Sequence, residues 1–297
     1  MAKTIKKKLK FLVIIIVGII GWLGIGHYNK ELKIESYNEE FYALKSTCSV
    51  FKSESNNEIS KKLSLKDNNE SVPILMYHSI GTVKLNPYVV STDKFNMDMK
   101  YLKDNGFTTV STDELYNFMV KNKPIPKKSV LITFDDGYED NYTNAFPILK
   151  KYNFKATIFV ITDSVDKCKK SLSSEQLKEM QNNGIDIESH TNLHDKLGTL
   201  TYATQLKTLK ASKEYIEKTL NKTVRYISYP FGNYNLDTLK AVNAAGYEMA
   251  FTTNGRWANK SNGILNLNRV FISGFHHSNS FQTRVNHSWY LFKYFYL

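Results

Sequence analysis

Short apolar runs alternate with amphipathic stretches along most of this chain, from about residue 72 onward. The runs have the length and the apolar, β-branched composition that is typical of buried strands. They begin at Ile74, Phe107, Val130, Ala156, Ile185, Arg225, Tyr247 and Leu267. Strands that alternate with helices predict a mainly parallel sheet, because parallel neighbours need a crossover connection.

The amphipathic stretches predict the helices of this α/β fold. They cover residues 93–104, 112–121, 142–152, 174–182, 202–220 and 236–245. Several end at helix-stop signals such as Asn105-Gly106, Asn183-Gly184 and Gly246. No glycine-rich nucleotide-binding turn follows a strand. We therefore predict a distorted, partly closed (β/α) barrel and disfavour an open doubly wound sheet.

The N-terminus differs in composition from this domain. Five lysines between Lys3 and Lys10 precede an uncharged apolar run from Phe11 to Gly26. This pattern predicts a transmembrane helix with its lysines in the cytoplasm and the remaining chain outside the cell. No small-x-small cleavage site follows, so we expect residues 1–27 to form an uncleaved, single-pass membrane anchor. The alternative is a signal peptide whose cleavage releases a secreted protein.

Residues 28–71 are polar and end in KSESNNEISKKLSLKDNNES, which suits a stalk or linker. The folded domain is then residues 72–297. We interpret the net charge of +12 as ordinary solvated surface and expect no binding of nucleic acid. We also expect a monomer. The only cysteines, Cys48 and Cys168, form no CxxC pair, so neither a disulfide scaffold nor a thiolate metal site is predicted.

Metal-binding and proton-transferring residues follow two of the predicted strands. Asp135 and Asp136 close the run VLITF, and His190 and His194 follow the run IDIES. One carboxylate and two imidazoles suffice to hold a catalytic metal with coordination positions left open. The second aspartate can then take a proton from water. This pairing predicts a hydrolase.

Further polar groups also follow predicted strands, namely His78 and the turn Pro230-Phe231-Gly232. In barrels, the loops after the C-terminal strand ends build the active site. Each motif has a plain structural explanation by itself, since Asp-Asp-Gly is common turn chemistry and two histidines can lie on the surface. Their shared position at one rim favours a site.

The segments TFDDGY and SHTNLH resemble the NodB-homology polysaccharide deacetylases of carbohydrate esterase family 4 over roughly residues 72–273. The resemblance implies the barrel fold of that family. It also implies a divalent metal ion held by Asp136, His190 and His194, with Asp135 as the catalytic base. Zinc is the first expectation for the metal, and cobalt, nickel and iron also accept these ligands.

The family's substrate motif corresponds to RYISYPFG, from Arg225 to Gly232. The resemblance implies that Pro230 shapes this turn and that the backbone N–H of Phe231 stabilises the oxyanion. Tyr138 and Trp257 are further candidates for contact with the sugar.

The sequence departs from the family pattern at three places. Ser228 stands where the family has a second arginine, and the acidic-and-tryptophan motif that partners this arginine is missing, with Trp257 in TTNGRW its nearest counterpart. The last strand lacks a catalytic histidine, whereas His78 ends the first strand. A barrel is circular, so moving the last strand to the front preserves the site. This order resembles the permuted subgroup that de-N-acetylates poly-β-1,6-N-acetylglucosamine, with His78 as the general acid.

Some residues and functions stay open at this point. Arg269 faces the site or forms a structural ion pair, and we interpret His276, His277 and His287 as surface residues. The favoured function is N-deacetylation of an extracellular N-acetylglucosamine polymer, with peptidoglycan, chitin oligomers and O-acetylated xylan as alternative substrates. Two other classes compete: a non-haem iron oxygenase, which uses the same ligand types, and a membrane-tethered glycan-binding protein with a degenerate site.

Overall fold

The computed structural model describes residues 65–82 and 85–290. Within these ranges no helix combines the length and apolar character needed to cross a membrane. The predicted anchor, residues 1–27, lies outside the described residues, as does most of the predicted linker. Strand β1 (Leu65–Lys66) pairs antiparallel with β6 (Ile125–Pro126), so contacts with the domain begin within the segment assigned to the linker.

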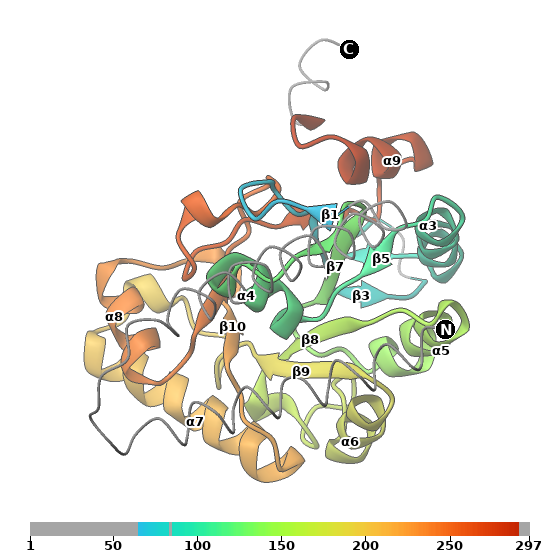
Figure 1. The fold of residues 1–297 in the computed structure, drawn as a ribbon. Coiled ribbons are helices and arrows are strands. Elements are labelled where there is room, and N and C mark those ends of the chain that lie inside the picture. The colour runs from blue at the N-terminus through green and yellow to red at the C-terminus, as the bar shows by residue number, and fades with distance from the viewer. Residues whose placement is uncertain (1–64, 83–84, 291–297) are drawn as a thin grey trace, which may run out of the picture. The chain divides into compact units, whose positions relative to one another are not determined.

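An eight-stranded sheet forms the centre of the domain (Figure 1). Its strands are β2 (Ile74–Tyr77), β5 (Thr108–Thr109), β7 (Ser129–Phe134), β8 (Ala156–Val160), β9 (Ile185–Ser189), β10 (Tyr226–Ser228), β11 (Met249–Phe251) and β12 (Val270–Phe271). The order is β11-β10-β9-β8-β7-β2-β12, with β5 also on β7, and every pair is parallel. A bridge from Phe251 of β11 to Leu267, in the segment that leads into β12, brings the two edges together. The sheet is therefore curled and incompletely closed, as predicted.

Helices cover the outer side of this sheet, except α4, which lies across the end of its interior (Figure 1). They are α3 (Thr92–Asp104), α4 (Thr112–Lys121), α5 (Phe146–Tyr152), α6 (Ser174–Asn182), α7 (Tyr202–Leu220), α8 (Leu236–Ala244) and α9 (Ser278–Asn286). A π-helical turn, η2 (Asn141–Ala145), leads into α5, and single 3-10 turns form η3 (Thr162–Ser164), η4 (Leu197–Thr199), η5 (Pro230–Gly232) and η6 (Lys260–Asn262). The short strands β3 (Ser79–Ile80) and β4 (Val89–Val90) pair with each other. The sequence predicted the α-helices α3 to α8 but not α9.

Side-chain caps explain why several helices begin where the sequence predicted. Ser111 accepts a hydrogen bond from the Glu114 N–H, and the Glu114 carboxylate accepts one from the Ser111 N–H. Ser173 and Gln176 form the same reciprocal pair before α6. Such capping boxes satisfy backbone donors that the first helical turn leaves unpaired.

Side chains alternate between the outer and the inner side of the sheet along each strand. This alternation gives an apolar layer on each side and determines where the site residues point. Val130 and Ile132 point outward to the helices, whereas Leu131 joins the inner cluster. Side chains of α4, such as Phe118, fill the N-terminal end of this interior. Inner positions at the opposite, C-terminal end are therefore left for polar groups, and Asp135 follows in the same alternation.

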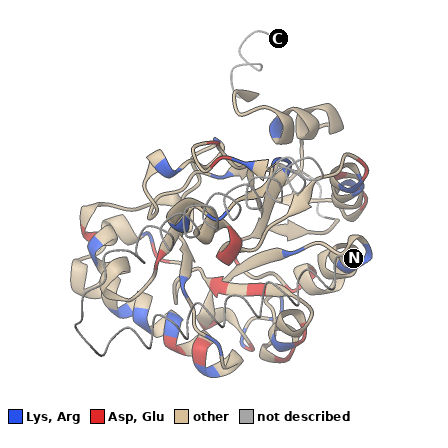
Figure 2. Cartoon of the chain, viewed as in Figure 1, with Lys and Arg blue, Asp and Glu red and all other residues tan. Residues whose placement is uncertain are grey.

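Charged residues of both signs share the outer helices. Figure 2 shows basic and acidic residues interspersed on α3, α6 and α7. Some charged residues pair along one helix, as Lys100 does with Asp104 and Lys240 with Asp237. Exposed pairs of this kind add little stability and are typical of a solvated surface.

Candidate active site

The three predicted metal ligands converge at the C-terminal end of the sheet. Asp136 follows β7, and His190 and His194 lie in the loop after β9. Their ligand atoms lie within 4.8 Å of one another. Asp136 Oδ1 is 3.4 Å from His190 Nε2 and 3.2 Å from His194 Nε2. The structure thus brings together all three residues.

The chemistry of this group fits a cation. His190 Nδ1 lies 2.8 Å from the Ser228 carbonyl oxygen. A carbonyl only accepts, so this nitrogen carries the proton and Nε2 presents its lone pair to Asp136. Asp136 Oδ1 is buried without a hydrogen-bond donor among the described residues. Burial alone would raise the pKa of Asp136, but the neighbouring imidazoles, when protonated, lower this pKa far below its usual range.

The backbone around these ligands adopts conformations that non-glycine residues rarely use. Asp136, Thr191 and His194 have φ values of 72°, 64° and 60°. Gly137 has a φ of 72°, and a Cβ there would lie 3.0 Å from Val160 Cγ1. Left-handed backbone of this kind costs free energy and gathers at functional sites. Asp-Asp-Gly is therefore more than a surface turn.

Asp135, the predicted base, is buried beside this group and held by Arg269. The Arg269 guanidinium donates to both carboxylate oxygens, at 2.7 and 2.6 Å. Ser228 Oγ donates to Asp135 Oδ2 at 3.2 Å. Burial alone would raise the pKa of Asp135, but the positive charge of Arg269 holds this pKa below its usual value. Asp135 is consequently a carboxylate that can accept a proton.

Arg269 resolves one departure from the family pattern. Its Nη2 donates to Ser228 Oγ at 2.7 Å, and its Nε donates to the Thr252 carbonyl at 2.9 Å. The side chain is fully buried. Ser228 therefore occupies the place of the expected arginine, and a guanidinium from the other edge of the sheet reaches the base. The available sequence signal was an arginine at an inward position, alternating with Leu267 and Phe271.

His78, the predicted acid, directly follows β2, which lies next to β7 in the sheet. The Asp135 N–H donates to the Tyr77 carbonyl at 3.0 Å, so the side chains of His78 and Asp135 emerge at the same level of the sheet. Asn141 Nδ2 donates to the His78 carbonyl at 2.8 Å and fixes this strand end. Burial lowers the pKa of His78, and the nearby carboxylates Asp135 and Asp136 oppose this shift.

The predicted substrate residues differ in their exposure and in how close they lie to the metal ligands. Phe231 has a φ of 60° and an exposed side chain, and its ring lies 4.5 Å from that of His194. Burial and the adjacent Asp136 raise the pKa of Tyr138 to about 12. Pro230 is buried at the start of η5.

Trp257 is not grouped with these residues. Its Nε1 donates to the Arg284 carbonyl at 2.7 Å, and Lys66 Nζ lies 5.9 Å from its ring. These neighbours belong to α9 and β1, so no contact of Trp257 with the described residues supports a substrate role.

One tail histidine is buried, contrary to the interpretation of all three as surface residues. His276 Nε2 lies 3.5 Å from Asp98 Oδ2, which also accepts a hydrogen bond from the Tyr77 hydroxyl at 3.0 Å. His277 and His287 are exposed. The burial of His276 follows from the packing of α9 against α3, a contact that a polar sequence did not indicate.

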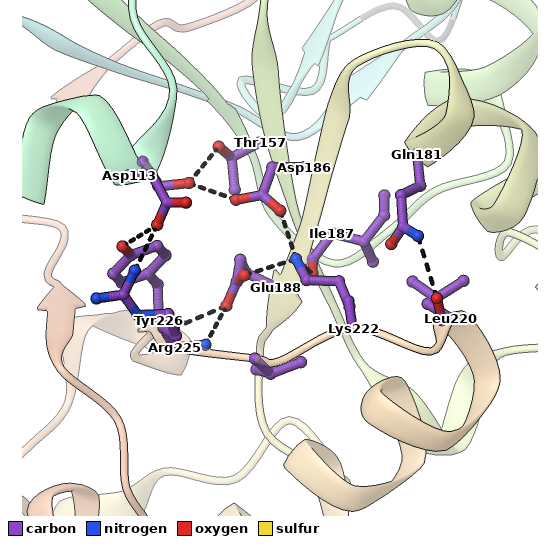
Figure 3. Close-up of polar contacts among 12 residues, drawn as sticks. Asp113, Thr157, Gln181, Asp186, Ile187, Glu188, Leu220, Lys222, Arg225 and Tyr226 are labelled. Carbon is purple, nitrogen blue, oxygen red and sulfur yellow. Dashed lines mark hydrogen bonds and ion pairs between the residues drawn. The ribbon is translucent and has the colours of Figure 1, made fainter.

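A second buried polar cluster lies toward the N-terminal end of β9 (Figure 3). Lys222 pairs with Asp186 and donates to Glu188 Oε1 at 2.7 Å and to the Ile187 carbonyl at 2.8 Å. Glu188 Oε2 accepts from the backbone N–H groups of Arg225 at 3.0 Å and Tyr226 at 2.7 Å. These side chains therefore link β9 to the segment that enters β10.

The pKa values of Glu188 and Lys222 are both raised, for different reasons. Burial raises the pKa of Glu188 to about 8. Burial alone would lower the pKa of Lys222, but the nearby carboxylates outweigh it and raise this pKa. Glu188 accepts three hydrogen bonds from donors that have no acceptor role. This geometry favours the carboxylate form of Glu188.

The curled parallel sheet and a histidine-carboxylate site at its C-terminal rim define a NodB-type α/β hydrolase. Residues 122–250 match the polysaccharide deacetylase family. YxkH of Bacillus subtilis, which is named as a polysaccharide deacetylase, is 44% identical over 202 residues, covering 68% of this chain and 71% of YxkH. The poly-β-1,6-N-acetyl-D-glucosamine N-deacetylase of Staphylococcus aureus is 32% identical over 240 residues, 72% of this chain and 82% of that protein.

A solved structure agrees with these sequence relatives. The Streptococcus pyogenes deacetylase PplD, solved in complex with acetate, superposes with a TM-score of 0.71 at 34% identity. The match covers 74% of this chain and all of PplD. The chain belongs to the polysaccharide deacetylase family, and it is an enzyme of the hydrolase class.

Proposed function

We propose that this deacetylase is metal-dependent and removes N-acetyl groups from an extracellular N-acetylglucosamine polymer, poly-β-1,6-N-acetylglucosamine first. The observation that supports this best is the grouping of Asp136, His190 and His194 beside a base held by Arg269. A glycan-binding protein with a degenerate site has no need of this ionised, buried Asp135. An oxygenase with the same ligand types has no use for it either.

In this proposal Asp136, His190 and His194 hold a divalent ion, zinc first, with cobalt, nickel and iron also compatible. When bound, the ion would supply Lewis-acid polarisation of the acetyl carbonyl and of the attacking water. Asp135 accepts the proton of that water, and Arg269 keeps Asp135 ionised for this step. The backbone N–H of Phe231 stabilises the oxyanion that forms. His78 donates a proton to the nitrogen as the C–N bond breaks, which yields acetate and a free amine.

The substrate assignment depends on relatives and on the permuted position of His78. The Staphylococcus aureus relative is named for poly-β-1,6-N-acetyl-D-glucosamine. The alternative substrates are peptidoglycan and chitin oligomers. Purified full-length chain should release amine from β-1,6-linked N-acetylglucosamine oligomers faster than from β-1,4-linked ones, after metal loading. Faster release from β-1,4-linked oligomers would favour the alternatives, and no release from either would contradict the function.

We further propose that the chain is a monomer anchored in the cell membrane by residues 1–27, with the catalytic domain outside; secretion after signal-peptide cleavage is the alternative. Protease added to intact cells should cut between residues 28 and 64 and release an active fragment. Cutting only after cell lysis would contradict this orientation.

A further inference from the structure

An exposed tyrosine lies against the predicted acid. Tyr88 directly precedes β4, and its side chain is 52% exposed. Its ring centroid is 5.0 Å from that of His78 and 5.4 Å from that of Phe271. Phe271 in turn lies 6.1 Å from His78. The three rings form one aromatic group at the C-terminal rim, and Tyr88 is its exposed member.

The backbone that carries Tyr88 is held from two sides. The Ser79 N–H donates to the Tyr88 carbonyl at 3.2 Å, across from β3. The Gly274 N–H donates to the Pro87 carbonyl at 2.8 Å, and a Cβ at Gly274 would lie 2.1 Å from the Val89 carbonyl oxygen. Only glycine permits this close approach of the two segments. Tyr88 is therefore presented on a fixed backbone, which lowers the entropic cost of binding a ligand.

The chemistry of deacetylation locates the sugar relative to this ring. The acetyl carbon must reach the attacking water beside Asp135, and the amide nitrogen must reach His78 to receive its proton. The pyranose ring is bonded to that nitrogen through one carbon, so the sugar lies on the His78 side of the site. Tyr88 is the exposed aromatic residue in contact with His78.

We propose that Tyr88, supported by Phe271, stacks against the pyranose ring of the N-acetylglucosamine residue that loses its acetyl group. This inference rests on the proposed function. A pyranose presents a face of C–H groups, and an aromatic ring offers it a flat, rigid, apolar surface. Phe231 does not duplicate this contact, because its ring lies against the metal-ligand residue His194. Tyr88 is thus a specificity residue for the sugar, and Phe231 belongs to the acetyl side.

Two measurements on the metal-loaded full-length chain test this proposal. The first is kcat and KM for a β-1,6-linked N-acetylglucosamine pentamer. The second is the Kd of the same pentamer in the Asp135→Asn background, which measures binding without turnover. Tyr88→Ala should raise KM and Kd about tenfold with kcat nearly unchanged, which is the range of one aromatic contact. Tyr88→Phe should stay near wild type, because stacking does not need the hydroxyl group.

A matched control and a sugar-free substrate complete the design. Trp289 is 49% exposed and its ring contacts His287, so Trp289→Ala should leave both values unchanged. Turnover of 4-nitrophenyl acetate, which carries no sugar, should not respond to Tyr88→Ala.

Each other outcome overturns the proposal in a recognisable way. A fall in kcat with unchanged Kd would show that Tyr88 acts through His78. An equal loss in Tyr88→Phe would assign the contact to the hydroxyl group. If the wild type releases no amine, the proposed function fails. The stacking role of Tyr88 is then tested by binding alone: a pentamer Kd that Tyr88→Ala leaves unchanged, or no pentamer binding at all, overturns it.

Discussion

One strand carries two buried polar clusters that differ in how their charges are satisfied. Asp186 and Glu188 of β9, and His190 directly after it, alternate with outward-facing Ile187 and Ser189, so they share the inner side. Toward the N-terminal end, the carboxylates are paired with Lys222 and accept backbone hydrogen bonds (Figure 3). At the C-terminal end, His190 faces a carboxylate oxygen that has no donor among the described residues.

This difference separates a structural cluster from a functional one. A buried charge is costly unless it is paired and hydrogen-bonded, and the cluster around Lys222 meets that condition with protein groups alone. The group around Asp136 meets it only with an added positive charge, from a bound cation or from protonation of its imidazoles, and its backbone is strained as well. Burial and charge therefore do not identify the site by themselves. The buried carboxylate oxygen of Asp136, which has no hydrogen-bond donor among the described residues and lies beside two imidazole nitrogens, does.

The largest expected effect is the loss of metal in His194→Ala. Removing one of three ligands should abolish stoichiometric zinc binding and activity while the fold stays intact, since His194 is partly exposed in a loop. Elemental analysis and circular dichroism measure both quantities. His277→Ala, at an exposed tail histidine, is the matched control. Full metal occupancy in His194→Ala would show that the group around Asp136 is not the metal site.

Asp135→Asn should come next, because it changes proton transfer and leaves the ligands in place. The expected loss in kcat is about 10²–10⁴-fold, the usual contribution of a positioned base. Metal content should remain stoichiometric by the same elemental analysis. Near-normal turnover would mean that the Arg269–Asp135 pair is structural, like the pair around Lys222.

The sequence predicted much of this arrangement for a physical reason. Strand-length apolar runs and capping residues act locally, so most elements lie close to their predicted positions. The metal residues follow strand ends, and parallel strands bring their C-terminal ends together. The pairing of Arg269 with Asp135 joins residues far apart in the chain, at strands β12 and β7, which lie on either side of β2. The alternation in the last strand could place Arg269 on the inner side, but no local pattern identifies Asp135 as its partner. No local pattern indicates the contacts of His276 and Trp257 either.

His78→Ala should affect the acetamide more than an activated ester. An amine is a poor leaving group unless its nitrogen is protonated, so turnover of the oligomer should fall by about 10²-fold. Turnover of 4-nitrophenyl acetate should fall much less, and metal content should be unchanged. Equal losses on both substrates would indicate that His78 has a binding or structural role.

Lys222→Met should lower stability and spare catalysis. It leaves the buried Glu188 and the partly buried Asp186 without their cation, which should reduce the free energy of unfolding by about 3 kcal/mol. Lys240→Met is the control, because its ion pair with Asp237 is exposed and contributes little. Urea unfolding measures the first quantity, and kcat of the metal-loaded folded protein measures the second. A large loss of kcat without a loss of stability would show that the paired cluster also serves the reaction.

Arg269→Lys should give the smallest effect, a shift in the pH dependence of the rate. A lysine keeps the positive charge, but it cannot donate to both Asp135 oxygens and to Ser228 as the planar guanidinium does. The pKa of Asp135, which Arg269 holds below its usual value, should therefore rise in the variant. Asp135 must be unprotonated to act as the base, so the acidic limb of kcat/KM should move to higher pH, with rates above it close to wild type. Arg225→Lys, which changes the guanidinium that pairs with Glu248 near the other end of the sheet, should leave the limb in place. A limb that is unmoved in Arg269→Lys, or that moves to lower pH, would show that Arg269 does not set the charge of the base.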